Sequence, residues 1–205
     1  MFTGIVQSVG RIDAVRPAAD GHRIEVDAAG LGVADVAVGD SIAVNGCCLT
    51  VIAVEETTLR FDLSAESARC TAGLVRPGPV NLEKALRLSD RLGGHLMSGH
   101  VDGVGVVVRF EHIRPAGMSE ADGGSVLLEI DVPPELARLV AAKGSIAVDG
   151  VSLTVNEISG RRFSVNLIPH TLAVTTLGAL AAGAAVNLEV DIIARYVARL
   201  HDPDA

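Results

Sequence analysis

Hydrophobic and polar residues alternate along much of this chain, which is the pattern of half-buried β-strands. One stretch with this alternation occurs twice, as residues 41–51 and as residues 145–155, and eight of its eleven positions are identical. Each copy contains a turn pair, Asn45-Gly46 or Asp149-Gly150, between β-rich segments. Such pairs tolerate positive φ and favour two-residue hairpins. The sequence therefore predicts a duplicated β-hairpin.

Further segments repeat in the same order, so we expect two domains of common ancestry. Residues 4–10 recur as 99–105, and residues 80–83 recur as 186–189. Each half offers about six short strands separated by turns, which favours a small antiparallel barrel. We expect an all-β fold of two six-stranded antiparallel Greek-key β-barrels in tandem. The expected domains are residues 1–95, residues 96–191, and a C-terminal helix with its tail over residues 192–205.

Three segments depart from the repeat. Residues 113–124 form a loop rich in Gly and Pro, which accounts for most of the increase in repeat spacing. Residues 133–140 begin with two prolines and continue with apolar residues at helical spacing, so they predict a short helix. A second apolar helical stripe consists of Ile192, Ile193, Tyr196, Val197 and Leu200. A helix of this length is unstable alone, so it must pack on its own barrel or on another subunit.

Composition excludes several classes of protein. A formal charge of −8 with only 2% aromatic residues offers neither the basic surface nor the stacking platforms of a nucleic-acid binder. We find no apolar run long enough to span a membrane, and the N-terminus does not resemble a signal peptide. Three cysteines, two of them adjacent, indicate a reducing cytoplasm rather than a disulfide framework. Neither a zinc-ligand spacing nor a dinucleotide loop is recognisable, so we expect no metal and no cofactor.

The duplicated hairpin keeps a small polar pair on one face in both copies. Cys48 and Thr50 share that face in the first copy, and Ser152 and Thr154 share it in the second. All four residues are compatible with ordinary strand positions. However, a barrel core gives no reason to keep a polar pair on the same face twice, so these residues are candidates for ligand binding.

Five further residues are candidates because they are titratable. His100 stands where the first half has Ile5, and histidine is suited to moving protons near neutral pH. Glu66 corresponds to His170, and either residue is also compatible with a solvated loop. Lys143 is equally compatible with a cation at a helix C-terminus, and His95 with a structural role. The two halves thus offer pockets of similar shape with different polar groups, which suits two copies of one ligand in unequal roles.

Several motifs resemble the riboflavin synthase family of tandem lumazine-binding barrels. They are the opening residues 1–6, the two hairpins, the run Gly93-Gly94-His95-Leu96-Met97-Ser98-Gly99-His100, and residues 167–171. The similarity covers residues 1–193 in order. It implies that two molecules of 6,7-dimethyl-8-ribityllumazine exchange a four-carbon unit, giving riboflavin and 5-amino-6-ribitylamino-uracil without a metal or redox cofactor.

The resemblance also implies the site residues. Those of the N-terminal barrel are Gly4, Ile5, Val6, Cys48, Leu49, Thr50, Asp62, Leu63, Ser64, Ala65, Glu66 and Ser67. Those of the C-terminal barrel are Gly99, His100, Val101, Lys143, Ser152, Leu153, Thr154, Asn166, Leu167, Ile168, Pro169, His170 and Thr171. Positions implicated in catalysis are His100, Cys48, Ser41 and Phe2. His100 is the candidate for proton transfer, whereas Cys48, Ser41 or bound water remains open as the nucleophile.

The implied partners are the lumazine, riboflavin as product, a homotrimer formed through the C-terminal helix, and association with lumazine synthase. The resemblance further implies an active site between the N-terminal barrel of one subunit and the C-terminal barrel of another. One alternative is a fluorescent carrier, since related lumazine proteins keep the barrels but only bind ligand. Another alternative is a scaffold within a larger vitamin-synthesis assembly. Retention of His100, Ser152 and Thr154 in the second half favours the enzyme.

Overall fold

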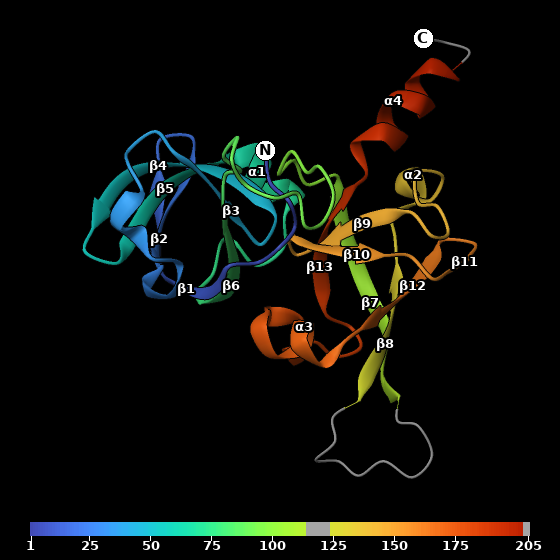
Figure 1. The fold of residues 1–205 in the computed structure, drawn as a ribbon. Helices are drawn as coiled ribbons and strands as arrows, with labels where there is room; N and C mark the ends of the chain where they lie inside the picture. Colours follow the sequence, from blue (N-terminus) through green and yellow to red (C-terminus); the bar gives the residue numbers. More distant parts are fainter. Residues whose placement is uncertain (114–123, 203–205) are drawn as a thin grey trace.

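The computed structural model describes residues 1–113 and 124–202, and it consists mainly of antiparallel strands. The first barrel consists of β1 (Ser8–Ala18), β2 (Gly21–Asp27), β3 (Ser41–Val44), β4 (Cys47–Glu55), β5 (Thr58–Ser64) and β6 (Gly78–Lys84). They close in the order β1-β2-β5-β4-β3-β6. Short helices connect some strands: η1 (Ala29–Leu31), η2 (Val33–Asp35) and α1 (Ala65–Cys70). This barrel lies on the left in Figure 1.

The second half is a seven-stranded sheet in the order β10-β9-β13-β7-β8-β12-β11. Its strands are β7 (Gly103–Ile113), β8 (Ser125–Asp131), β9 (Ser145–Val148), β10 (Val151–Thr154), β11 (Glu157–Ser159), β12 (Arg162–Leu167) and β13 (Ala185–Val190). Its helices are α2 (Pro134–Ala137), α3 (Pro169–Val174) and η4 (Thr176–Ala179). The two end strands, β10 and β11, are consecutive in the chain and separated only by residues 155–156. The sheet is therefore the same barrel with the counterpart of β4 divided in two.

The expected all-β fold of two related barrels with a C-terminal helix is confirmed, whereas the domain boundaries at residues 95/96 and 191/192 stay a prediction. One helix is shorter than expected. The segment 133–140 forms α2 only over Pro134–Ala137, because the next backbone bonds, such as Leu139 N–H to Leu136 O, span three residues and make tighter turns. The loop expected over residues 113–124 lies almost wholly outside the described residues.

Each barrel has its own apolar core, and a small third cluster joins them. Phe2, Ala43, Met97 and Ala147 form this cluster, and all four are buried. Phe2 and Met97, which are equivalent in the repeat, pair through reciprocal backbone hydrogen bonds of 2.8 and 3.1 Å. This reciprocal pairing of equivalent residues indicates that the two halves are related by an approximate two-fold axis.

The hairpin tips meet across the same relation. A Cβ on Gly46 would lie 2.8 Å from the nitrogen of Gly150. The side-chain amide of Asn81 donates to the carbonyl of Asp149 at 2.9 Å, and that of Asn187 donates to the carbonyl of Asn45 at 3.0 Å. The repeated asparagines therefore join the two barrels through their hairpins.

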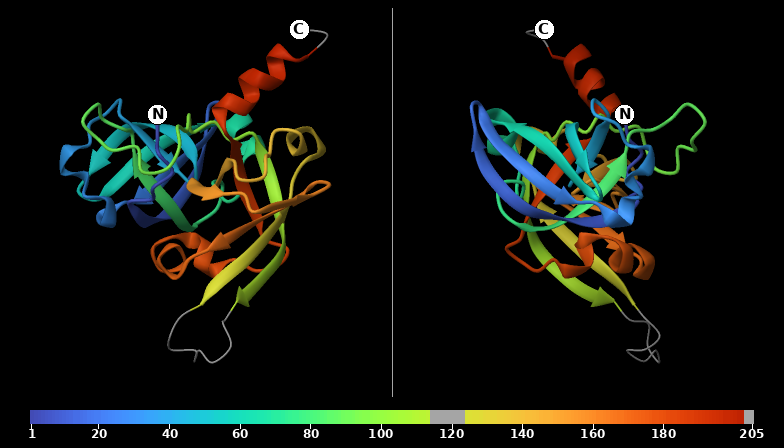
Figure 2. Two further views of the ribbon diagram at one scale, coloured as in Figure 1. Left: turned by 45° about the vertical axis from the view of Figure 1, so that its right-hand side comes forward. Right: turned by 90° about the vertical axis from the view of Figure 1, so that its left-hand side faces the viewer.

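The C-terminal helix α4 (Ile192–Leu200) projects from the body, as both views in Figure 2 show. Four apolar side chains along it are exposed: Ile193 by 67%, Tyr196 by 68%, Val197 by 47% and Leu200 by 84%. Among the described residues, no helix is both long enough and apolar enough to cross a membrane.

Candidate active site

Both hairpins present a polar face that points away from their cores. On the first hairpin this face bears Ser41, Ala43, Cys48 and Thr50. The counterparts on the second hairpin are Ser145, Ala147, Ser152 and Thr154. The register therefore confirms that each polar pair shares a face, and it adds a serine from the preceding strand to each.

The segment that lies on each hairpin comes from the other half of the chain. The backbone N–H of Cys48 donates to the carbonyl oxygen of Gly99 at 2.8 Å, and that of Ser152 donates to the carbonyl oxygen of Gly4 at 2.8 Å. The approach is so close that a Cβ on Gly99 would lie 2.6 Å from the Cβ of Cys48. Side-chain packing shows the same exchange, because Val101 packs against the core of the first barrel and Val6 against the core of the second.

This exchange corrects one expectation from the sequence. We expected residues 4–6 beside Cys48 and residues 99–101 beside Ser152. That assignment is wrong, because each segment pairs with the hairpin of the other barrel. The repeat shows which residues are equivalent, but equivalent residues need not lie in the same pocket.

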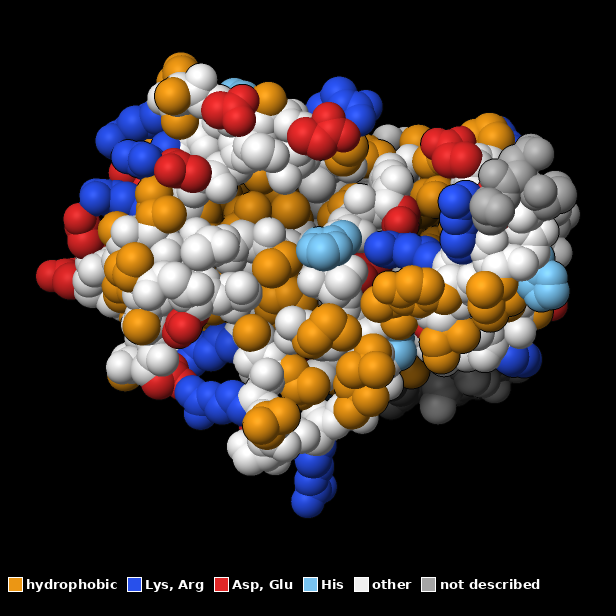
Figure 3. Space-filling model, turned by 90° about the horizontal axis from the view of Figure 1, so that it is seen from above, with side chains coloured by type: hydrophobic (Ala, Val, Ile, Leu, Met, Phe, Trp, Pro, Cys, Tyr) orange, Lys and Arg blue, Asp and Glu red, His pale blue; other side chains and the backbone are white. Residues whose placement is uncertain are grey.

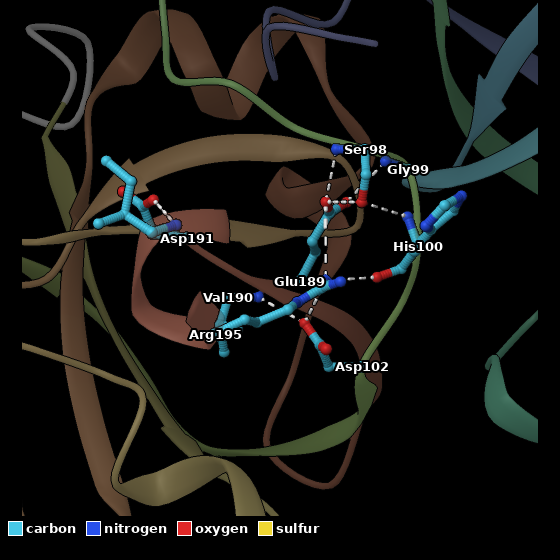
Figure 4. Close-up of polar contacts among 9 residues, drawn as sticks. Ser98, Gly99, His100, Asp102, Glu189, Val190, Asp191 and Arg195 are labelled. Atoms are coloured by element: carbon cyan, nitrogen blue, oxygen red, sulfur yellow. Dashed lines mark hydrogen bonds and ion pairs between the residues drawn. The ribbon is translucent and has the colours of Figure 1, made fainter. Parts of the chain in front are cut away.

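Two buried carboxylates hold the crossing segments in place. Glu83, at the end of β6, accepts hydrogen bonds from the backbone N–H and hydroxyl of Thr3 and from the N–H of Gly4, at 2.7 to 3.0 Å. Burial raises the pKa of Glu83, while these donors act in the opposite direction. Glu189 makes the same three contacts with Ser98 and Gly99 (Figure 4). Sequence reasoning missed this role, although both carboxylates recur inside an apolar closing strand.

The first candidate pocket contains Cys48, Thr50 and the segment that leads to His100. His100 and Thr50 are exposed, and Cys48 is half-buried. His100 follows directly on the residue that is bonded to Cys48. The structure therefore brings the backbone of the His100 segment next to Cys48, although the two are far apart in the sequence. The adjacent Cys47 lies in the core, where burial raises its pKa to about 12, so it is unsuited to act as a nucleophile.

The second candidate pocket contains Ser152, Thr154 and Ile5. The Ser152 hydroxyl lies 2.7 Å from Nδ1 of His95, which is buried. Burial lowers the pKa of His95 and favours its neutral form. The other ring nitrogen, Nε2, is buried without a partner among the described residues. His95, which we considered for a structural role, therefore contacts a candidate site residue.

The two runs after the repeated strands also keep their equivalence. Residues 62–67 lead from β5 into α1, and residues 166–171 lead from β12 into α3. In the first run, Arg69 and Cys70 bond to Glu66 and lower its pKa to about 2, so this carboxylate is ionised and already paired. Its counterpart His170 is exposed.

The remaining predicted residues occupy different environments. Phe2 is fully buried, which indicates a packing role beneath Gly99 and Cys48. Ser41 lies opposite Thr50 and lines a hollow of about 230 Å³ together with Lys84. Lys143 is exposed, with φ of 66°.

A larger hollow of about 420 Å³ lies between the barrels at the hairpin tips, and neither it nor the hollow beside Ser41 is lined by Cys48, His100 or Ser152. Figure 3 shows patches of hydrophobic side chains on the face from which α4 rises, with a histidine and basic side chains among them. Among the described residues, no group of three or more His, Cys, Asp or Glu side chains is arranged to hold a metal ion.

Comparisons with known proteins point to one family. A family model described as the lumazine binding domain matches residues 3–85 and again residues 98–191. Riboflavin synthase from Photobacterium phosphoreum is 41% identical over 202 residues, which cover 98% of this chain and 88% of that protein. Riboflavin synthase from Mycobacterium tuberculosis is 43% identical over 209 residues, which cover 98% of each chain.

Solved structures show the same architecture. LumP complexed with riboflavin matches with a TM-score of 0.80 and 27% identity, and LumP complexed with 6,7-dimethyl-8-(1'-D-ribityl) lumazine matches with a TM-score of 0.77 and 26% identity. Each match covers 93% of this chain and 99% of the other.

Proposed function

Because this chain belongs to the riboflavin synthase family of tandem lumazine-binding domains, we propose that it is a transferase acting on two molecules of 6,7-dimethyl-8-ribityllumazine. It moves a four-carbon unit from one molecule to the other and releases riboflavin and 5-amino-6-ribitylamino-uracil. The observation that supports this most strongly is the pair of related but unequal pockets. One pocket joins Cys48 to the His100 segment, and the other joins Ser152 to Gly4 and His95.

The first pocket binds one lumazine through residues 48–50, 62–67 and 99–101. The second binds the other through residues 4–6, 152–154 and 166–171. Exposed strand-end backbone groups bind the pyrimidine edge, and the hydroxyls of Thr50, Ser152 and Thr154 bind the ribityl chains. This division keeps the residues expected from the family and adopts the crossing that the hydrogen bonds reveal.

The chemistry requires loss of a proton from the 7-methyl group of one lumazine and addition of a nucleophile to the other. His100 transfers the proton, because its imidazole is exposed beside the first pocket. Of the two candidate side chains, Cys48 is the better-placed nucleophile, since its backbone N–H bonds to Gly99, the residue before His100. Holding two rings face to face supplies much of the acceleration, because such positioning is worth about 7–11 kcal/mol.

A direct assay separates this enzyme from a ligand carrier. Purified protein mixed with 6,7-dimethyl-8-ribityllumazine should produce riboflavin and the uracil in equal amounts, followed by absorbance and chromatography. Tight binding without riboflavin would overturn the proposal and select the carrier, which the structural likeness to LumP makes the natural alternative.

We propose that three chains assemble through α4. The exposed residues Ile193, Tyr196, Val197 and Leu200 recur at helical spacing on a helix too short to be stable alone. Assembly also brings the open first pocket of one subunit to the second pocket of another, with Lys143 extending toward the neighbour's ligand. Light scattering should give a trimer for the native chain and a smaller mass for Leu200→Glu. A native monomer would contradict this assembly.

We further propose association with lumazine synthase and residence in the cytoplasm. The first is implied by the family, and co-purification with a tagged lumazine synthase tests it. The second is supported by three free cysteines, one of them buried, which suit a reducing compartment. Cell fractionation with an antibody to this chain tests it, and recovery outside the cytoplasmic fraction would refute it.

A further inference from the structure

A cation from α4 reaches the main chain of the first pocket. The Nη2 of Arg195 donates to the carbonyl oxygen of His100 at 3.0 Å and to Oδ2 of Asp102 at 2.9 Å. Figure 4 shows the guanidinium between the two acceptors. Asp102 is in turn fixed, since its Oδ2 accepts the backbone N–H of Val190 at 2.8 Å. The helix, the end of β13 and the His100 segment therefore meet at one arginine.

These groups are shielded, which makes the contacts stronger than ordinary surface ion pairs. The Asp102 side chain is 16% exposed and that of Arg195 is 29% exposed. Nη2 also lies 3.9 Å from the buried carboxylate of Glu189, which holds Ser98 and Gly99. Without Arg195, two carboxylates would remain near one another without their shared cation.

The first half shows what the barrel does without this arginine. The counterpart of Asp102 is Gln7, whose Oε1 accepts the backbone N–H of Lys84 at 2.9 Å, as Asp102 accepts that of Val190. Among the described residues, no basic side chain bonds to Gln7. The contact to the closing strand thus recurs in both halves, whereas the bonded arginine occurs only in the half that bears His100.

We infer that Arg195 is a positioning residue that fixes the main chain of His100 and so orients its imidazole toward the Cys48 pocket. This inference rests on the proposed function, because it assigns the bridge to the proton-transfer residue of that reaction. It also links assembly to catalysis, since the same helix carries the exposed stripe of Ile193, Tyr196, Val197 and Leu200.

The test compares Arg195→Gln with Arg199→Gln in the full-length protein. Arg199 lies on the same helix, but its partner is Asp202 at 3.6 Å and its side chain is 68% exposed. Because a misplacement of about 1 Å can cost 10²-fold, we expect Arg195→Gln to lower kcat at least about tenfold while KM changes less than about threefold. Arg199→Gln should keep both constants. Arg195→Lys should recover part of kcat, since an ammonium keeps the positive charge but does not reproduce the position from which Nη2 donates to both acceptors.

Two further measurements distinguish positioning from a merely structural role. In a His100→Ala background, Arg195→Gln should lower kcat by less than about twofold, because its effect passes through the missing imidazole. The NMR signals of the His100 ring should shift in Arg195→Gln and not in Arg199→Gln.

Several outcomes would overturn the inference: equal kcat for the two arginine variants, multiplicative losses in the double variant, or a loss that disappears when high protein concentration restores the oligomer. If the native protein binds the lumazine without turnover, the proposed function fails on its own. The inference is then decided by the His100 ring signals, and unchanged signals in Arg195→Gln would overturn it.

Discussion

Replacing Asp149 with asparagine should stabilise the protein at neutral pH. Asp149 is 7% exposed at the tip of the second hairpin, and its Oδ1 accepts the backbone N–H of Asn187 at 2.8 Å. In the first half, Asn45 occupies the equivalent position and its Oδ1 accepts the N–H of Asn81 at 2.7 Å. Asp149→Asn therefore keeps the hydrogen bond and removes only the titratable charge.

The magnitude follows from the pKa of Asp149, which burial raises from 3.8 to about 7. Because the folded state holds this proton more tightly than the unfolded state, the free energy of unfolding falls as pH rises between these two values. A difference of about 3 units at about 1.36 kcal/mol each gives roughly 4 kcal/mol above pH 7. Water penetration at the tip reduces this figure, so it is an upper bound.

The assay is urea unfolding at about pH 4 and about pH 8, where the difference between the proteins should be small and large respectively. Asp149→Asn should raise the midpoint at the higher pH and flatten its dependence on pH. The reverse variant, Asn45→Asp, should lower the midpoint there by placing a second carboxylate at the interface. Equal or lower stability of Asp149→Asn at the higher pH would show that the buried carboxylate of Asp149 does not destabilise the fold.

Three further variants test the candidate site. Cys48→Ala should reduce turnover strongly with little change in the free energy of unfolding. Cys47→Ala, its buried neighbour, should cost about 1–2 kcal/mol of stability, as measured by urea unfolding. Equal losses of stability in the two variants would indicate that Cys48 has a packing role instead. Gly99→Ala should abolish turnover, since φ at this residue is 78° and the added Cβ would clash with Cys48. The control Gly39→Ala also has positive φ, 98°, but has open space around it, so it should lose only roughly 1–2 kcal/mol of stability. Glu189→Gln should lose a charged hydrogen bond worth about 1.5–3 kcal/mol and displace Gly99, which lower kcat and altered backbone NMR signals would report.

Local chemistry made the hairpins predictable. Asn45 and Asp149 both have φ of 46°, and the glycines after them also have positive φ, as their turn pairs predict. Alternation of apolar residues likewise predicted which faces of these hairpins are buried. The helical spacing of residues 192–200 predicted α4, although the sequence left its packing partner open.

The pairing of segments with pockets was not predictable in the same way. Backbone hydrogen bonds such as that from Cys48 to Gly99 leave no pattern of side chains in the sequence, because they join a glycine of one half to a strand of the other. The proximity of His95 to Ser152 follows from the same crossing. The ion pair of Asp102 with Arg195 could not be predicted from the repeat either, since Arg195 lies outside the repeated part of the chain.

In the proposed reaction, catalysis joins the Cys48 pocket of one subunit to the Ser152 pocket of another. Mixed oligomers of Cys48→Ala and Ser152→Ala, purified through two different tags, test this directly by riboflavin formation. Each variant alone should be nearly inactive, and the mixed oligomer should recover activity, because some contacts between subunits then pair an intact first pocket with an intact second one. Mixed oligomers no more active than either parent would contradict the claim.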